Sequence, residues 1–212
     1  DRSIAGDLAE SFEASDTSKK WVFKLRKGLT FHNGKTVTSA DVLESLRHHT
    51  GANTKSPAKS ILAGVKEMKA EDPVTVVFTM NDSNPDFPYM LADYHLPIMP
   101  GKDGGGIDLS APMGTGPFVM QKLVFGTSAK LKRNPNYHKN NKPYFDEVEF
   151  LTLQDVTART NALLTGETHF MNNCDVKTLA QLKRAPNINV QSVTSTRHFN
   201  FDMNTQVAPF NN

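Results

Sequence analysis

The side chains best suited to chemistry in this chain are seven histidines and one cysteine. The histidines are His32, His48, His49, His95, His138, His169 and His198. A zinc site needs ligands at fixed spacing, such as a HEXXH motif or a histidine pair at i and i+4 on one helix, and none of the seven stands in such a motif. The sequence therefore gives no support to a metal site, and we expect solvated or hydrogen-bonded histidines.

A covalent mechanism would need a nucleophile, a base and an oxyanion donor that converge in space. No G-x-S-x-G elbow marks a serine, and Cys174 is the candidate thiol nucleophile. A partly buried, unreactive thiol is the favoured interpretation of Cys174. A hydrolase is thus the weaker hypothesis, and no internal disulfide is possible with a single cysteine.

Neither glycine-rich stretch fits a phosphate-binding motif. Residues 101–106 (GKDGGG) and 114–117 (GTGP) lack the spacing of a P-loop or a dinucleotide fingerprint. We interpret 101–106 as a flexible loop and a candidate domain boundary. The sequence implies no cofactor.

Six cations without an acid lie between residues 121 and 145. They are Lys122, Lys130, Lys132, Arg133, Lys139 and Lys142. A nucleic-acid patch would need interleaved exposed aromatic side chains, so a solvated strand face is favoured. The formal net charge of +2 agrees with a chain that does not bind nucleic acid.

The 212 residues suffice for one large or two small domains. Alternating apolar residues predict strands at 21–25, 74–80, 118–123, 129–132, 148–153, 190–193 and 199–203. A helix is predicted from Asp155 to Leu164, ending at Gly166. A second helix should follow Asp175, with Val176, Leu179 and Leu182 on one side.

The stretch 21–42 combines three local signals. The strand at its start should bury Trp21, and Asn33-Gly34 predicts a turn. The residues from Thr38 to Asp41 have capping-box spacing, so a helix should begin there. This stretch is therefore framework rather than a reactive site.

The strand predicted at 199–203 has two unlike faces. Phe199, Phe201 and Met203 alternate with the polar residues His198, Asn200, Asp202 and Asn204. A polar face of this kind is typical of a strand that borders a cleft. A plain edge strand that faces solvent fits the pattern equally well.

Four blocks, in order along the chain, resemble the solute-binding proteins of peptide and nickel ABC transporters. They are "LAESFEASDTSKKWVFKLRKGLTFHNGKTVTSADVLESL", "MGTGPFVMQKLVFGTSAKLKRNPNYHKNNKPYFDEVEF", "ARTNALLTGETHF" and "FDMNTQVAPFNN". Asn33, His138 and His169 depart from the family's usual Asp, Trp and Asp. All three departures lie in framework blocks, so they leave the resemblance intact.

The resemblance implies a mixed α/β (α+β) fold, a periplasmic-binding-protein-like lobe with a small flanking α+β domain, truncated. Residues 1–112 would form the flanking domain, and residues 113–212 the mid-chain part of the first ligand-binding lobe. The first strands and the second lobe of the family would be missing. Exposed apolar side chains should then appear near residues 114–123 or 198–204, where the missing parts would dock.

The resemblance also implies a function and its partners. A protein of this kind captures a peptide or similar small solute in the periplasm and delivers it to a membrane permease, as a monomer and without covalent chemistry. Nickel chelates, haem, opines and sugars are alternative ligands in the family. A hydrolase and a permease-docking module without ligand are alternatives of other classes.

The resemblance suggests ligand contacts in the segment "FMNNCDVKTLAQLK". Consecutive asparagines line the cleft in oligopeptide-binding relatives, which points to Asn172 and Asn173, with Cys174 adjacent. The alternative is that the asparagines only complete a turn before a helix capped by Asp175. His198 and Asn200 are further ligand-binding candidates, on the polar face of the last predicted strand.

Overall fold

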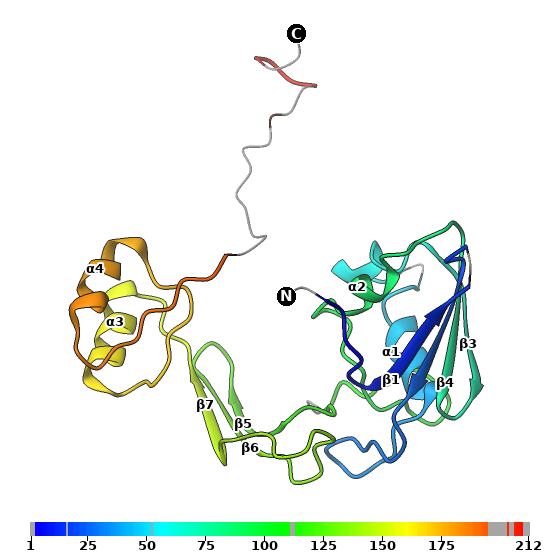
Figure 1. Ribbon diagram of the computed structural model, residues 1–212, viewed down its shortest axis with the longest axis horizontal. Helices are drawn as coiled ribbons and strands as arrows, with labels where there is room; N and C mark the ends of the chain where they lie inside the picture. Colours follow the sequence, from blue (N-terminus) through cyan, green and yellow to red (C-terminus); the bar gives the residue numbers. More distant parts are fainter. Residues whose placement is uncertain are drawn as a thin grey trace. The chain divides into compact units, whose positions relative to one another are not determined.

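The computed structural model describes residues 3–15, 17–51, 53–110, 113–194, 203 and 206–209. The chain forms two compact units, residues 1–151 (unit 1) and 152–212 (unit 2). Unit 1 contains two β-sheets, and unit 2 contains two α-helices (Figure 1). Within these described residues, no helix is both long enough and apolar enough to span a bilayer.

The first sheet of unit 1 has four antiparallel strands. They are β1 (Ala9–Ala14), β2 (Lys20–Leu25), β3 (Val65–Asp72) and β4 (Thr75–Met80). Their order across the sheet is β1-β2-β4-β3, so β2 and β4 occupy the centre. The alternating residues of β2 and β4 were readable in the sequence, and both predicted strands are confirmed.

An aromatic cluster fills the core beside this sheet. Phe23 and Phe78 meet edge to face at 5.5 Å, and Phe87 contacts Phe78 at 5.0 Å. Phe87 begins the short helix α2 (Phe87–Leu91), at the end of the stretch 81–88 whose sequence is compatible with a loop or the start of a short helix. Trp21 is 7% exposed, and its indole N–H donates to the carbonyl of Asn84 at 3.1 Å. The predicted burial of Trp21 is thus confirmed.

Helix α1 (Ser39–Arg47) packs against β3 and β4 (Figure 1). Its buried apolar face consists of Val42, Leu43 and Leu46. Its N-terminus has the predicted capping box. The Asp41 carboxylate accepts hydrogen bonds from the backbone N–H of Thr38 at 2.9 Å and from the Thr38 hydroxyl at 2.7 Å. The predicted turn is also present, since Gly34 has a φ of 83° and its N–H donates to Phe31 O.

The glycine-rich segment 101–106 is bonded to α1, and its interpretation as a candidate domain boundary stays a prediction. It lies within unit 1 and closes on itself through a bridge between Gly101 and Ile107. Its backbone is bonded to α1, because Gly101 N–H donates to Asp41 Oδ1 at 2.8 Å and Gly106 N–H to Glu44 Oε2 at 2.6 Å. Glycines usually signal freedom of the chain, but here they let the backbone approach a helix.

The second sheet of unit 1 has three antiparallel strands in the order of the sequence. They are β5 (Phe118–Val124), β6 (Ser128–Arg133) and β7 (Glu147–Leu151), close to the predicted ranges. Every one of these strands comes after residue 112, and every strand of the first sheet comes before it. The proposed division of the chain at residues 112 and 113 stays a prediction.

The three-stranded sheet separates charged from apolar residues. Cross-strand partners share a face, so Lys122, Lys130 and Glu149 form one row on one side. Lys130 Nζ lies 3.8 Å from Glu149 Oε2, which shows that part of the basic run is balanced by acids from β7. The structure thus contains the solvated strand face that we expected for the basic run between residues 121 and 145.

The opposite face of this sheet carries an apolar row of Leu123, Ala129 and Phe150. Leu123 on the edge strand β5 and Phe150 on β7 are exposed. The predicted exposed apolar side chains near residues 114–123 are therefore present. The second expected location, residues 198–204, lies almost wholly outside the described residues.

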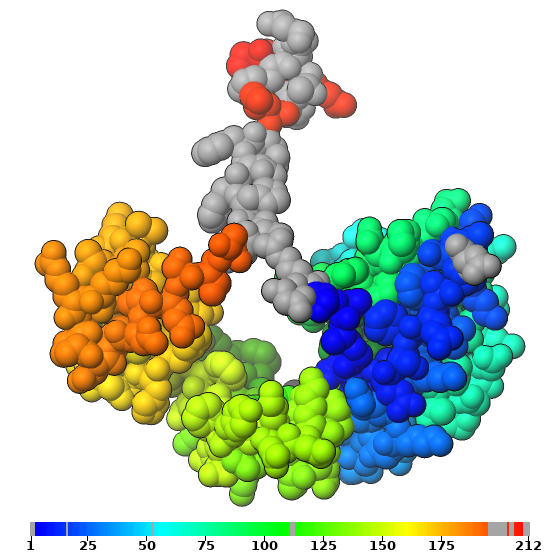
Figure 2. Space-filling view, viewed as in Figure 1, coloured from blue at the N-terminus to red at the C-terminus, as the bar shows by residue number. Residues whose placement is uncertain are grey.

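Unit 2 contains α3 (Val156–Thr165) and α4 (Val176–Arg184), drawn in yellow and orange in Figure 2. Asp155 Oδ1 caps α3 by accepting from Ala158 N–H at 2.7 Å, and Gly166 ends it with a φ of 79°. Both helix ends agree with the sequence prediction. Ala162 of α3 and Leu182 of α4 are buried and form the interior of this small unit.

One prediction for unit 2 is wrong. Residues 190–193 form no strand, although their residues alternate. Alternation describes a face but does not say whether another strand pairs beside it. The predicted helix after Asp175 is confirmed as α4, in which Leu182 is buried and Val176 is exposed.

Candidate functional site

The predicted ligand-binding segment lies directly before α4. Asn172 and Asn173 are both exposed, and Asn173 has a φ of 50°, the left-handed conformation that asparagine tolerates. Asp175 follows and caps α4, since its Oδ1 accepts from Lys177 N–H at 2.7 Å. The turn and the cap that formed the alternative interpretation are thus present. They hold the two asparagine amides at the surface, where both can donate and accept hydrogen bonds.

Cys174 is held against the first turn of α4. Its Sγ lies 3.4 Å from the carbonyl oxygen of Asp175 and 4.0 Å from the hydroxyl of Thr178. The side chain is partly buried. None of these partners is a base that would activate a thiol, so the geometry is that of a packed side chain beside a polar surface.

Two exposed apolar side chains flank the asparagines. Phe170 is 81% exposed and Val176 is 83% exposed. Large apolar side chains at such exposure are typical of contact surfaces rather than of a folded interior. Residues 170–176 therefore present amides and apolar groups together, a combination that suits a ligand with both polar backbone and apolar parts.

The other two candidate residues, His198 and Asn200, lie outside the described residues. The structure brings Asn172, Asn173 and Cys174 together in one segment. The role of His198 and Asn200 stays a prediction.

A second polar cluster lies within unit 1, where the GTGP turn meets two other segments. The carbonyl oxygen of Gly116 accepts from His32 Nε2 and from Asn134 Nδ2, both at 3.0 Å. The backbone adds a bond from His32 N–H to Gly114 O at 2.9 Å. Since Nε2 of His32 donates, its Nδ1 is the acceptor, and this buried atom has no partner among the described residues. This cluster fixes the connection between the two sheets.

A third cluster joins the beginning of unit 1 to the loop after β6. Asp7 Oδ1 lies 2.6 Å from Lys139 Nζ and 3.0 Å from His138 Nε2. Burial raises the pKa of Asp7, but the hydrogen bonds and charges of Lys139 and His138 lower it more, so the carboxylate stays ionised. The pKa of Lys139 is raised chiefly by its hydrogen bond to Asp7. The resemblance predicted a framework role for His138. In the structure its ring binds Asp7 and so helps to hold the beginning of unit 1 to the loop after β6.

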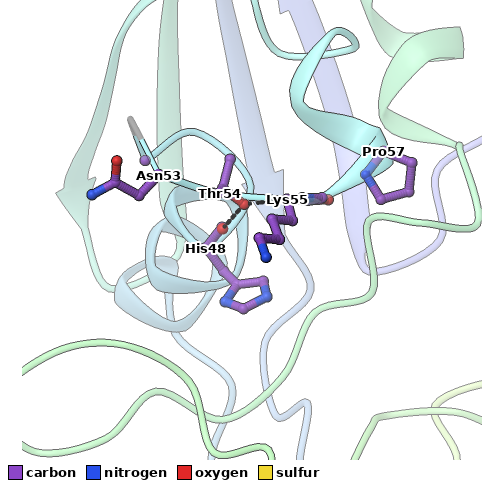
Figure 3. A pocket seen from close by; sticks show the side chains of 7 residues that line it. His48, Asn53, Thr54, Lys55 and Pro57 are labelled. Carbon is purple, nitrogen blue, oxygen red and sulfur yellow. Dashed lines mark hydrogen bonds between the residues drawn. The ribbon is translucent and has the colours of Figure 1, made fainter.

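A surface pocket of about 740 Å³ lies at the end of α1 (Figure 3). It is lined by His48, Gly51, Asn53, Thr54, Lys55, Ser56 and Pro57. The Thr54 hydroxyl donates to the carbonyl oxygen of His48 at 3.1 Å and closes the loop around it. None of the predicted site residues lies here. No motif in the sequence predicted this pocket, because its lining comes from an ordinary polar loop.

A serine of the same loop lies beside a histidine, an arrangement that bears on the hydrolase hypothesis. Ser56 Oγ lies 2.6 Å from His49 Nδ1. The hydroxyl also caps a short 3₁₀ helix, η1 (Pro57–Lys59), by accepting from Ala58 N–H at 3.2 Å. This is the geometry of a structural cap. Among the described residues, no group of three or more His, Cys, Asp or Glu side chains is placed to hold a metal ion.

Comparison with known proteins bears on all of these features. The family model of the bacterial extracellular solute-binding proteins, family 5 (middle), matches residues 3–212. The probable D,D-dipeptide-binding periplasmic protein DdpA of Escherichia coli K12 is 29% identical over 216 residues, which cover 98% of this chain and 41% of DdpA.

Solved structures agree with this match. The binding protein AgaA from A. tumefaciens R10, in complex with agropinic acid, has a TM-score of 0.78 at 31% identity and covers 84% of this chain and 37% of its own. DppA from Helicobacter pylori, in complex with the peptide STSA, has a TM-score of 0.77 at 27% identity and covers 87% and 41%.

These matches confirm the mixed α/β, periplasmic-binding-protein-like fold that the sequence predicted. The chain spans less than half the length of each of these relatives. Because the family model matches nearly the whole chain, the chain belongs to the bacterial extracellular solute-binding proteins of family 5.

Proposed function

We propose that this chain is part of the solute-binding component of an ABC importer. The component captures a peptide or a similar small solute outside the cytoplasm and delivers it to a membrane permease. The match of the family model over residues 3–212 is the observation that carries this proposal. The periplasm is the proposed location, since the relative DdpA is named as a probable periplasmic protein.

The relatives indicate which class of ligand to test first. DdpA is a probable D,D-dipeptide-binding protein, DppA was solved with the peptide STSA, and AgaA was solved with agropinic acid. Two of these three ligands are peptides, so a short peptide is the first choice and an opine-like acid the second. Nickel chelates, haem and sugars remain alternatives of the same family.

The exposed segment 170–176 is the proposed contact surface within this chain. The amides of Asn172 and Asn173 match the donors and acceptors of a peptide backbone. Cys174 lies beside them, and His198 and Asn200 are proposed as further contacts. In the whole protein, closure of two lobes around the ligand would complete the enclosure.

We propose no catalytic role and no nucleic-acid partner for this protein, and we expect it to be monomeric. The Ser56–His49 pair is explained by helix capping, and the basic strand face is partly balanced by Glu149. A docking module without a ligand is the remaining rival. It predicts that the protein binds its permease but no solute.

Calorimetry on the protein as its gene encodes it, with short peptides and opine-like acids as ligands, tests the proposal. The double substitution Asn172→Ala/Asn173→Ala should weaken the binding of the identified ligand about tenfold or more, because each lost hydrogen bond costs about 1 kcal/mol. The melting temperature should fall only slightly, since both side chains are exposed and the cost is confined to the left-handed backbone of Asn173.

A matched control is available in the same unit. Asn187 and Asn189 are also exposed, and Asn187→Ala/Asn189→Ala should leave affinity unchanged. Equal affinity of both double variants and the wild type would remove Asn172 and Asn173 from the site. Failure of every small solute to bind, together with binding to the permease, would favour the docking module instead.

A further inference from the structure

His49 lies at the end of α1 and is buried, with 8% of its surface exposed. Its Nδ1 is 2.6 Å from Ser56 Oγ. Buried histidines must find hydrogen-bond partners for their ring nitrogens, and they resist protonation unless an acid lies nearby. The bond to Ser56 therefore defines the chemical state of His49.

The second contact of Ser56 leaves its hydroxyl proton available for His49. Its Oγ accepts from Ala58 N–H as the cap of η1, and Ala58 is fully buried in the main core. One lone pair of Oγ is used in this way, and the hydroxyl proton can point at His49 Nδ1. With the hydroxyl as donor, His49 is a neutral imidazole that accepts at Nδ1 and carries its proton on Nε2.

The groups that face His49 do not favour a charge there. His48, the next residue, meets its ring edge-on at 5.0 Å. His95, in the loop after α2, is bound to Asp93 at 2.7 Å, so that carboxylate already has a partner. Lys55 lines the adjoining pocket. In the described part of the chain, His49 makes no ion pair of its own.

These neighbours, and burial above all, set the titration of His49. Burial lowers the pKa of His49, and the positive charges of His48 and His95 lower it further. A base whose pKa falls on folding takes up its proton more readily when the surrounding structure opens. The closed form is the one in which residues 53–59 pack on the core, and it is therefore fully favoured above the ordinary histidine pKa of about 6.5. Below that value, the ratio of closed to open form falls by up to tenfold per pH unit.

We propose that the His49–Ser56 hydrogen bond is an acid-sensitive latch. A proton on Nδ1 turns this nitrogen from an acceptor into a donor, so the Ser56 hydroxyl must turn away, and it places a charge at a buried position where no acid is paired with it. Residues 53–59 then separate from the core at Ala58, and the pocket shown in Figure 3 changes shape. Mild acid, rather than a ligand, would therefore open residues 53–59 of unit 1.

Amide hydrogen exchange of the full chain between about pH 7 and pH 5 tests the latch, with protection corrected for the intrinsic exchange rate. In the wild type, protection of residues 53–59 should fall about tenfold, while the amides of β4 keep theirs. His49→Asn keeps an acceptor near the position of Nδ1 but does not titrate, so its protection should change less than twofold. His48→Asn is the matched control. Its protection should still fall with acid, because His49 still titrates, but by less than in the wild type, because one charge beside His49 is gone.

Two results would overturn the proposal. One is protection of residues 53–59 that does not depend on pH in the wild type, and the other is the same pH dependence in His49→Asn. If His49→Asn does not fold, NMR of the wild-type histidine rings replaces it. At pH 7 the His49 ring should carry its proton on Nε2, and a proton on Nδ1 would rule the latch out.

Discussion

Asp41 and Gly101 are joined by a hydrogen bond of 2.8 Å, from the backbone N–H of Gly101 to Asp41 Oδ1. The same oxygen is 2.6 Å from Lys35 Nζ, while Oδ2 accepts both hydrogen bonds from Thr38. Asp41 is only 2% exposed. One carboxylate therefore caps α1 and also holds the glycine-rich loop against it, which links two segments 60 positions apart in the chain.

Substitution of this carboxylate should be costly. Asp41→Ala removes the capping box and leaves the N–H groups of Thr38 and Gly101 without their acceptor, so we expect a loss of about 3 kcal/mol in the free energy of unfolding. Urea unfolding measures it. Asp103→Ala, in the same loop but exposed, should stay within about 0.5 kcal/mol. Similar losses in both variants would show that the loop is not held by Asp41.

The same residue should make stability depend on acid. Burial raises the pKa of Asp41, but hydrogen bonds from Lys35, Gly101 and Thr38 outweigh this and lower it. A carboxyl whose pKa falls on folding stabilises the protein above its unfolded pKa of about 3.9 and loses that contribution as the pH falls through the folded pKa.

Asp41→Asn keeps the shape of the side chain but does not titrate. The gap in unfolding free energy between wild type and Asp41→Asn should therefore be largest at neutral pH and should shrink below about pH 4. Urea unfolding at several pH values provides the measurement. A gap that stays constant down to about pH 2 would contradict the assignment of this titration to Asp41.

Trp21 is the chain's single tryptophan, so its fluorescence reports on the core of the first sheet. Its emission in the native protein should peak at a shorter wavelength than in the unfolded chain, because the indole is buried. Trp21→Ala should cost about 3–5 kcal/mol. Identical emission maxima before and after unfolding would mean that this core is not formed.

Gly166 ends α3 in the left-handed conformation, with a φ of 79° and open space where a Cβ would stand. Gly166→Ala should therefore destabilise unit 2 by about 1 kcal/mol through backbone strain and not through collision. Gly51 has equal space but no positive φ. Gly51→Ala is the control in denaturant titrations and should be neutral. If the two variants lose equal stability, strain at Gly166 is not the cause.

Local signals in the sequence predicted much of this fold. The alternation around Trp21, the capping box of Asp41 and the terminal glycine of α3 each depend on residues within a few positions. Their physical causes are equally local, since strand pleat, helix capping and positive φ are set by neighbouring atoms. Those elements were therefore accessible from the residues themselves.

Features that depend on distant partners were not accessible. The bond from Asp41 to Gly101 and the position of the glycine-rich loop arise from segments that meet only on folding. Residues 190–193 show the reverse case, because their alternation is not matched by a strand in the described part of the chain. For the candidate site, the resemblance suggested Asn172 and Asn173, which stay a prediction, and only the structure showed that Phe170 and Val176 are exposed beside them.

The carbonyl oxygen of Gly116 has a consequence for how mutations combine. It receives both the His32 ring and the Asn134 amide, so its two lone pairs are filled by side chains from two different segments. Once one donor is lost, the other can no longer hold the connection in the same geometry. Substitutions at His32 and Asn134 should therefore show epistasis, with a combined effect that departs from the sum of the single effects. Sequence change at either position is thus constrained by the residue present at the other.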